Sequence, residues 1–557
     1  MKKRLLLIIP FVFILFLLVA VCGNKVSINP RIIVLDENDE EIVYLNNLNK
    51  TSTVDIEDLQ DKYIEYILWI EDKDFYKHSG FSIPRILKSI LNNLFHSQKQ
   101  GGSTITQQYV KNTYLSNKKS IGRKLKEIYL SIKLENNMTK DEILSEYLSA
   151  LYFGNNVYGL SNAARYYFDK NIEELTDQEM ISFIALWNAP TVYSNHLDKW
   201  NQKKNALADT LLKKGILDSQ TYQSVIRDIK LNLNPNFLNS NRSYFIDQVI
   251  SEFKKLTIRA NFNEVIRIKT CYNPNTEDVA SELDTDYALL SLNRQGYFTA
   301  CIGDRNYTES SYNIAINGKR DIGSTIKPLL YYEAIKCGLG DSVFQSELYS
   351  FSYRKEIITV SNSSNHYFNS IDMLTALAVS DNIYATKMHL KLGMNTLVNH
   401  LKKYNIEAKP YPSLALGSVG LSLKQLISIY FQFFSEGKYV YPKFIYEIEV
   451  NGKVFQTKAE IIQMGDKKIC NQLKEMMASV FDTSIPYATC NSIAARLNTK
   501  CYGKSGLTDY DSYMIGFDEN HLVAVWSGDI ENDELLNPEY KRLPKELFWK
   551  TINRLNE

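Results

Sequence analysis

The apolar pattern of this chain changes character about half-way along its length, and that change limits the folds open to it. Over residues 55–198 apolar side chains recur at three- and four-residue spacing, which is typical of amphipathic helices. From about residue 267 the chain alternates helical segments with strand-like runs such as Ala288–Leu292, Tyr297–Ile302 and Leu522–Trp526. A chain of 557 residues also exceeds a typical single domain. The sequence therefore predicts a mainly α unit followed by an α+β unit.

Two capping boxes support the helical prediction for the first unit. Thr139–Glu142 and Thr176–Glu179 each place a threonine three residues before a glutamate, so that each can cap a helix that starts there. Residues 83–95 form an apolar stripe. That stripe faces either a protein core or a membrane surface.

The connection between the units is predicted in a stretch rich in turn-forming residues, 232–241. A helix at Tyr244–Leu256 is expected to follow it. The predicted parts are a cytoplasmic stub and membrane anchor at 1–24, the first unit at 50–230, a linker at 231–266 and the second unit at 267–557.

The N-terminus predicts a single membrane-spanning helix. Three cations, Lys2, Lys3 and Arg4, precede an uncharged apolar run at Leu5–Cys22, whose length is near the minimum for crossing a bilayer. Cations on this flank predict a cytoplasmic N-terminus and an exported remainder. A cleaved signal peptide is the alternative, but Val19–Val21 offers no clean small-residue cleavage site.

Composition excludes some classes of function. The formal net charge is +1 and long basic runs are absent, so nucleic acid is not an expected partner. The seven cysteines are scattered and form no Cys-x-x-Cys pair, so a structural zinc site is not expected. Whether the cysteines form disulfides stays open.

Three motifs in the first unit combine residue types that a reaction on a phosphorylated sugar needs. They are Glu-Asp-x-x-Phe-x-x-His-x-Gly at 71–80, Gly-Gly-Ser-Thr-Ile-Thr-Gln-Gln at 101–108 and Arg-Lys-x-Lys-Glu at 123–127. A general base must meet a hydroxyl, and cations must take up the charge of a departing phosphate. Each motif alone has an ordinary structural explanation, as a helix start, a turn and a solvated helix face. Their combination in this order indicates catalysis.

Three further motifs mark the second unit. They are Ser-x-x-Lys at 324–327, Ser-Asp-Asn at 380–382 and Lys-Ser-Gly at 504–506. Ser324 and Lys327 stand three apart at a helix start and share one face, so the amine can reach the hydroxyl. Ser-x-x-Lys alone is common, but the three motifs in this order are the pattern of penicillin-binding proteins and serine β-lactamases.

With both sets of motifs, nearly the whole chain resembles the class A penicillin-binding proteins. The resemblance continues through 140–148, 152–154, 158–159, 412–418 and 516–517. It implies a lysozyme-like, mainly α peptidoglycan glycosyltransferase domain, and then an α+β transpeptidase domain of the penicillin-binding and β-lactamase type.

The resemblance assigns roles in the first unit. Glu71 would be the general base that activates the acceptor sugar hydroxyl, and Glu127 would assist near the donor pyrophosphate and a divalent ion, Mg²⁺ or Mn²⁺. His78 would make a structural hydrogen bond. The family usually has an arginine where Lys119 stands and an asparagine where Ser149 stands. The expected substrate-binding residues are Asp72, Phe75, Ser103, Thr104, Gln107, Gln108, Lys111, Lys119 and Lys126.

In the second unit the resemblance makes Ser324 the nucleophile that attacks the bond between two terminal D-alanines of a stem peptide. Lys327 would be its base, and the backbone N–H groups of Ser324 and Leu507 would form the oxyanion hole. The family usually has threonine where Leu507 stands. Ser380 would relay a proton, Asn382 would orient the substrate amide, Lys504 would supply positive potential, and Ser505, Leu507 and Thr508 would bind substrate without a cofactor.

The resulting hypothesis is a membrane-anchored enzyme that polymerises glycan strands from lipid II and cross-links their stem peptides, with both catalytic domains outside the cytoplasm. Its expected partners are lipid II, nascent peptidoglycan, the membrane, β-lactams as inhibitors, and other proteins of wall synthesis or division. The alternative is a glycan polymerase whose second unit is weak or inactive and serves as a peptide or β-lactam sensor or scaffold.

Overall fold

The structure is a computed structural model. It describes residues 31–46, 49–51, 54–82, 103–115, 120–155, 157–234, 242–256, 265–276, 279, 285–305, 307, 310, 312–529 and 535–557. The predicted membrane anchor, the apolar stripe at 83–95, Gly101, Gly102 and Lys119 lie outside these residues. Within the described ranges no helix combines the length and the apolar character needed to cross a bilayer. The chain divides into two compact units.

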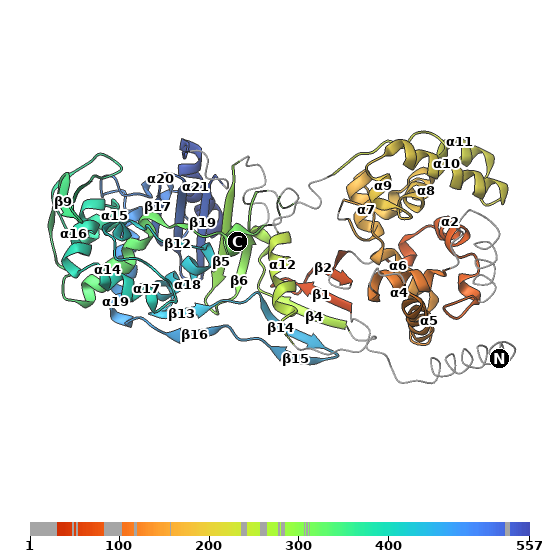
Figure 1. Cartoon of the computed structure of the whole chain (residues 1–557), viewed down its shortest axis with the longest axis horizontal. Coiled ribbons are helices and arrows are strands. Elements are labelled where there is room, and N and C mark those ends of the chain that lie inside the picture. The colour runs from red at the N-terminus through yellow and green to blue at the C-terminus, as the bar shows by residue number, and fades with distance from the viewer. Residues whose placement is uncertain are drawn as a thin grey trace. The chain divides into compact units, whose positions relative to one another are not determined.

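The first unit is mainly helical, as predicted, and it also contains strands (Figure 1). Its elements are β1 (Arg31–Leu35), β2 (Glu41–Asn46), β3 (Asn49–Thr51), η1 (Ile56–Asp58), α2 (Asp61–Glu71), η2 (Phe75–Lys77), α4 (Ile105–Tyr114), α5 (Ile121–Glu135), α6 (Lys140–Ala150), α7 (Leu160–Phe168), η3 (Ile172–Glu174), α8 (Asp177–Leu186), α9 (Pro190–Tyr193), α10 (Leu197–Lys213) and α11 (Ser219–Val225).

The core of the first unit surrounds α8, in which every residue from Met180 to Leu186 is buried. Trp200 of α10 is fully buried and donates its indole N–H to the Ser182 carbonyl at 2.7 Å. Both predicted capping boxes are present, at Thr139 and Thr176. These caps fix where α6 and α8 begin.

A six-stranded sheet, which the sequence patterns did not predict, joins strands far apart in the chain. Its order is β15-β14-β4-β1-β2-β3, where β4 is Val265–Thr270, β14 is Ile445–Val450 and β15 is Lys453–Gln456. Parts of β4, β14 and β15 therefore belong to the first unit although they lie far from β1 in sequence.

The second unit is built on an antiparallel five-stranded sheet of order β17-β18-β19-β5-β6. The three predicted strands are β5, β6 and β19, and the predicted helix at Tyr244–Leu256 is α12. Its elements are α12 (Arg242–Phe253), η5 (Pro274–Thr276), β5 (Tyr287–Asn293), β6 (Phe298–Ile302), α13 (Ile314–Asn317), β7 (Arg320–Asp321), η6 (Gly323–Ile326), α14 (Lys327–Lys336), β8 (Phe344–Ser346), β9 (Tyr349–Tyr353), β10 (Glu356–Val360), β11 (Phe368–Ile371), α15 (Met373–Ala378), α16 (Asn382–Leu392), α17 (Asn395–Lys402), η7 (Pro412–Leu416), β12 (Gly420–Leu421), α18 (Leu423–Phe434), β13 (Lys438–Tyr441), β16 (Glu460–Gln463), α19 (Lys467–Met477), η8 (Ala478–Phe481), α20 (Asn491–Ala494), β17 (Tyr502–Leu507), β18 (Asp511–Phe517), β19 (His521–Gly528) and α21 (Pro538–Leu555).

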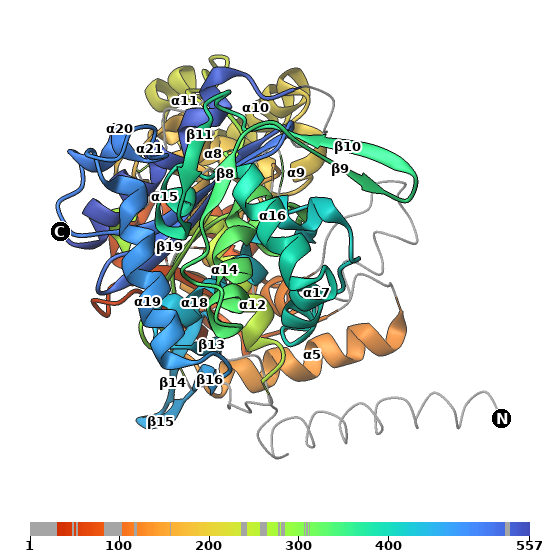
Figure 2. The ribbon, with the colours of Figure 1, turned by 90° about the vertical axis from the view of Figure 1, so that its left-hand side faces the viewer.

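Helices cover both faces of this sheet. Leu547, Phe548 and Ile552 of α21 pack in one buried cluster with Val523 and Val525 of β19. A Cβ on Gly516 of β18 would lie 2.9 Å from Phe548 of α21, whereas the ring of the next residue, Phe517, contacts Phe434 of α18. Because successive side chains of a strand point to opposite faces, α18 covers the other face. Figure 2 shows α14, α16 and α19 in front of the sheet, with the β9–β10 hairpin projecting beside α16. Strand β17 forms one edge of the sheet.

Candidate active sites

Glu71 is the last residue of α2, where its half-buried side chain is held by three donors. Gln108 donates to one carboxylate oxygen at 2.8 Å, while the Trp187 indole donates to the other at 3.1 Å and the Asn188 amide at 3.5 Å. Tyr147 in turn donates to the Gln108 amide oxygen at 3.2 Å. The carboxylate is thus fixed in direction while part of it stays accessible, which suits a general base.

Asp72 has a structural role, and its role in binding substrate stays a prediction. Its side chain is fully buried and accepts the Ile105 N–H at 3.0 Å, at the start of α4, and a hydrogen bond from His78 at 2.9 Å. The structural hydrogen bond predicted for His78 is therefore confirmed. Phe75 is fully buried as well, and its contact with substrate stays a prediction. The side chains of Asp72 and Phe75 both lie where the end of α2 meets the start of α4.

Thr104 and Gln107 form a capping box at the N-terminus of α4. Both are fully buried, and the Thr104 hydroxyl also donates to the Gly80 carbonyl at 2.7 Å. Gly80 has φ +85°, and a Cβ there would lie 2.8 Å from the Ser131 carbonyl oxygen, so glycine is required. The side chains of Thr104 and Gln107 build this turn, and their binding of substrate stays a prediction.

Glu127 is only 1% exposed and lies between two cations. Arg123 contacts one of its oxygens at 3.4 Å, and Lys124 contacts the other. Lys124 also donates to Ser103 at 3.0 Å, so it connects Glu127 with the polar loop. Lys124 was not among the predicted site residues, whereas Lys111 and Lys126, which were, are exposed and open to solvent.

A divalent ion at Glu127 does not fit the residues that surround it. Both oxygens of that carboxylate are engaged by cations, which compete with a metal for the same lone pairs. In the part of the chain that the structure describes, no three His, Cys, Asp or Glu residues are grouped as metal ligands. The divalent ion stays a prediction.

Ser149, the departure from the family pattern, has a defined structural task. Its hydroxyl accepts the Val54 N–H at 2.9 Å and donates to the Ser145 carbonyl at 2.9 Å. A serine at this buried position therefore ties α6 to the segment that precedes α2.

In the second unit Ser324 lies on η6, directly before α14, whose first residue is Lys327. Gly323 has φ +55°, and a Cβ there would lie 2.9 Å from the Leu507 nitrogen and 2.8 Å from its carbonyl oxygen. Glycine thus lets the backbone of η6 lie directly against that of β17. This close approach brings the N–H groups of Ser324 and Leu507 to the same region, as an oxyanion hole requires.

Lys327 is fully buried, and its amine donates to three oxygen atoms. These are the Ser380 carbonyl at 2.7 Å, the Ser380 hydroxyl at 3.2 Å and the Asn382 amide oxygen at 2.8 Å. Burial holds the pKa of Lys327 well below its usual value, and the positive charge of Lys504 lowers it further. A neutral amine one helical turn after the half-exposed Ser324 can act as its general base.

Ser380 stands at the centre of this group, with a left-handed backbone at φ +58°. Its hydroxyl also accepts a hydrogen bond from Lys504 at 2.8 Å. The neighbouring Asp381 caps α16 and is held by Ser346 at 2.5 Å and Asn362 at 2.7 Å. The three predicted motifs therefore meet in one hydrogen-bonded cluster in the second unit.

Comparison with known proteins agrees with both sites. Residues 38–212 match the family described as transglycosylase, and residues 286–520 match the penicillin-binding protein transpeptidase domain. Penicillin-binding protein 2D of Bacillus subtilis is 31% identical over 568 residues, which span 96% of this chain and 82% of that protein. The chain belongs to the class A penicillin-binding proteins.

Two further relatives extend this comparison. Penicillin-binding protein 1A of Streptococcus pneumoniae is 25% identical, over 92% of this chain and 77% of that protein. The crystal structure of penicillin-binding protein 1A from Haemophilus influenzae superposes with a TM-score of 0.58 at 16% identity, covering 96% of this chain and 93% of that one. The second similarity concerns the fold alone.

For a class A penicillin-binding protein, the group at the end of β17 is unusual. Leu507 is 42% exposed, whereas Ser505 is 9% exposed. The Thr508 hydroxyl accepts the Asp511 N–H at 2.8 Å and contacts the Asp511 carboxylate at 3.2 Å, so it is engaged in the turn before β18. The predicted substrate contact of Thr508 is therefore not supported. Leu507 leaves an apolar side chain at the position where the family pattern leads us to expect a threonine hydroxyl.

We expect Leu507→Thr to accelerate acylation of Ser324 by β-lactams by about 10- to 100-fold. A threonine hydroxyl on this edge strand can donate to the β-lactam carboxylate, a charge-assisted hydrogen bond of about 1.5–3 kcal/mol that leucine cannot make. The measurement is the second-order rate constant of acylation by a fluorescent penicillin. Leu507→Val removes apolar surface without adding a hydroxyl and is the matched control. An unchanged rate in Leu507→Thr would refute the explanation.

The pH dependence of acylation is expected to follow Lys504. Lys504 is fully buried, and burial lowers its pKa to about 7. The amine is charged below that pH and neutral above it. Acylation should therefore slow as pH rises through about 7, because the neutral amine no longer attracts a substrate carboxylate. In Lys504→Arg this decline should disappear, since a guanidinium stays charged; a decline unchanged by that substitution would contradict the assignment.

Cys301, Cys337, Cys470, Cys490 and Cys501, all within the described residues, are free thiols, and of these Cys301, Cys470, Cys490 and Cys501 are buried. Burial raises the pKa of each of these four thiols, so they stay neutral.

Proposed function

We propose that this protein is a bifunctional peptidoglycan synthase, which polymerises glycan strands from lipid II with its first unit and cross-links stem peptides with its second. The observation that carries this proposal is the meeting of Lys327, Ser380, Asn382 and Lys504 in one cluster beside Ser324, on a chain that also holds Glu71 between Gln108 and Trp187. Both family matches support the two activities.

In the glycosyltransferase reaction, Glu71 takes the proton of the acceptor sugar hydroxyl. The freed oxygen attacks the anomeric carbon of the donor, and the bond from that carbon to the pyrophosphate breaks. Lys111, Lys126 and the Lys124–Ser103 pair supply donors and positive charge for the leaving pyrophosphate. Trp187 and Gln108 hold the carboxylate of Glu71 in the direction that proton transfer needs.

In the transpeptidase reaction, the Ser324 oxygen bonds to the carbonyl carbon of the penultimate D-alanine and passes its proton to Lys327. The backbone N–H groups of Ser324 and Leu507 stabilise the oxyanion. The peptide C–N bond then breaks, and the proton reaches the leaving amine through Ser380, which contacts both lysines. An amine of a second stem peptide resolves the ester and regenerates the Ser324 hydroxyl.

The location of the protein is part of the same proposal. The apolar run at Leu5–Cys22, preceded by cations, supports a single anchor with a cytoplasmic N-terminus and both catalytic units outside. Lipid II, nascent peptidoglycan and the membrane are the proposed partners, together with other proteins of wall synthesis or division, and β-lactams are the proposed inhibitors.

The test uses the full-length chain in two assays. A fluorescent penicillin should label the wild type and not Ser324→Ala, while lipid II polymerisation should proceed in both. A sensor or scaffold with an inactive second unit is the alternative, and the intact cluster around Lys327 disfavours it. Polymerisation without penicillin labelling would support that alternative, and a protein inert in both assays would refute the proposal.

A further inference from the structure

The segment 482–490 lies behind the cluster of Lys327, Ser380 and Lys504, outside all the motifs. The helix η8 that precedes it contacts both α15 and β17. The Thr489 N–H donates to the Ala378 carbonyl at 3.0 Å, at the end of α15, and the Cys490 N–H donates to the Val480 carbonyl at 2.8 Å. The last carbonyls of a helix lack partners within it, so Thr489 satisfies one of them. Ser380 follows Ala378 by only two residues.

Lys545 of α21 holds the same residue from the other side. Its ammonium donates to the Thr489 carbonyl at 2.7 Å, and its side chain is half-buried. The backbone of Thr489 is therefore fixed between α15, which leads into Ser380, and the C-terminal helix. A cation is a strong donor for a carbonyl, so this contact resists displacement.

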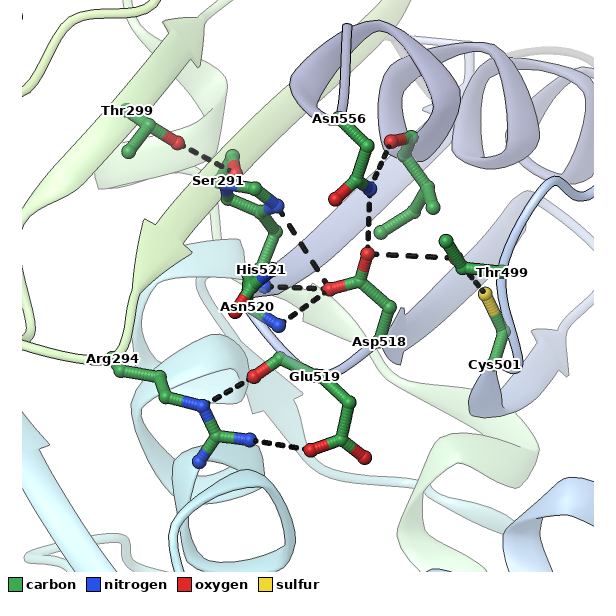
Figure 3. Close-up of polar contacts among 11 residues, drawn as sticks. Ser291, Arg294, Thr299, Thr499, Cys501, Asp518, Glu519, Asn520, His521 and Asn556 are labelled. Atoms are coloured by element: carbon green, nitrogen blue, oxygen red, sulfur yellow. Dashed lines mark hydrogen bonds and ion pairs between the residues drawn. The ribbon is translucent and has the colours of Figure 1, made fainter.

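The C-terminal helix is itself anchored, which gives Lys545 a fixed position. Figure 3 shows Asn556, directly after α21, reaching Asp518 in the turn between β18 and β19. Its amide donates to one Asp518 oxygen at 2.6 Å. The other oxygen accepts the N–H groups of Asn520 at 2.8 Å and His521 at 2.7 Å. This anchor binds the end of α21 to the sheet that carries Lys504.

The charged and titratable groups around Lys504 come from four elements. Lys327 comes from α14 with Asp381 beside it, Cys490 from the segment behind the cluster, and Lys545 from α21. Burial raises the pKa of Cys490. Cys490 in turn acts to raise the pKa of Lys504, against the lowering by burial. Besides burial, the charge of Lys545 lowers the pKa of Lys504.

We propose that Lys545 is a positioning residue of the transpeptidase site, which holds the loop of Ser380 through Thr489 and places a second positive charge behind Lys504. It touches neither substrate nor the reacting atoms. The inference rests on the proposed transpeptidase activity and adds to it a residue that lies more than two hundred positions from Ser324 in sequence. The C-terminal helix thereby determines how the catalytic cluster is arranged and charged.

Three substitutions separate the two tasks of Lys545. Lys545→Arg keeps charge and donor, Lys545→Gln keeps a donor without charge, and Lys545→Met keeps neither. Each is measured in the full chain as the second-order rate constant of penicillin acylation against pH. Lys541→Met, an exposed lysine on the same helix, is the matched control, and Asn556→Ala loosens α21 without changing charge near Lys504.

We expect Lys545→Arg to behave as the wild type. In Lys545→Gln and Lys545→Met the slowing of acylation that follows the titration of Lys504 should move to higher pH by about half a unit or more. Removing a positive charge raises the pKa of Lys504. Lys545→Met should also lose about tenfold in maximal rate, the effect of losing one charged hydrogen bond. Lys541→Met and Asn556→Ala should leave the position of the decline unchanged.

Other results would overturn the inference. The role of Lys545 would be only structural if the pH at which acylation declines stayed the same in both Lys545→Gln and Lys545→Met. The same conclusion would follow if Lys545→Met and Asn556→Ala lost equal rate and neither changed that pH. Lys545→Gln retains a donor, so it keeps the test valid if Lys545→Met does not fold. A wild type that is never acylated would instead refute the transpeptidase function itself.

Discussion

Replacing Glu71 with glutamine is expected to reduce lipid II polymerisation by about 10²–10⁴-fold, the range that a positioned general base contributes. Glutamine has nearly the same shape, but it cannot take up the proton of the acceptor hydroxyl. It also offers a single acceptor oxygen to Gln108 and Trp187, which both donate to the carboxylate. The measurement is the rate at which lipid II is converted to glycan chains by the full-length protein.

Two controls isolate the effect of Glu71. Glu65→Gln makes the same change at an exposed position of the same helix and should leave polymerisation at the wild-type rate. Penicillin acylation of Ser324 should be unaffected in Glu71→Gln, which shows that the second unit is intact. Substantial polymerisation by Glu71→Gln would move the role of base to another group and would refute the proposed reaction.

The residues that could be predicted from sequence are those whose contacts depend on short, local spacing. Ser324 and Lys327 share one face of a helix start whatever surrounds them. The capping boxes at Thr139 and Thr176 likewise depend on four consecutive residues. For the same reason strands β5, β6 and β19 were predicted at nearly their observed bounds, since alternation and apolar runs mark a buried strand.

What could not be predicted depends on which way a side chain points after the units fold. Asp72, Thr104 and Gln107 belong to the same motifs as Glu71 and Gln108. The first three are buried, and they build the turn that holds the other two in place. Motif membership alone does not distinguish a residue that binds substrate from one that shapes its neighbour. Trp187, which donates to Glu71, lies 116 residues away along the chain and is spaced like a core residue of α8.

The local sequence pattern likewise does not predict which distant strands pair with one another. The order β15-β14-β4-β1-β2-β3 brings together segments from the start, the middle and the later part of the chain. Each strand is short, between three and six residues. A short strand has too few residues for a clear alternation, and nothing in its own sequence names its partner.

Lys327→Met is expected to slow acylation of Ser324 by about 10²–10⁴-fold, because it removes the amine that accepts the serine proton. Methionine retains much of the volume of the buried side chain, and the change removes a buried amine rather than leaving a charge without a partner. The Ser380 and Asn382 oxygens lose a donor, so a modest loss of thermal stability should accompany the loss of rate. The measurement is the rate constant of acylation by a fluorescent penicillin over a range of pH.

The pH profile separates loss of the base from loss of structure. In the wild type, acylation should also decline at low pH, where Lys327 becomes protonated below its lowered pKa. The residual acylation of Lys327→Met should lack this acid decline, because the group that titrates is gone, while the decline near pH 7 that belongs to Lys504 should remain. Lys336→Met, an exposed lysine on the same helix, should retain the wild-type rate and both declines. If the acylation rate of Lys327→Met still declined at low pH, the base would be another group. The variant lacks the amine whose protonation is proposed to cause that decline.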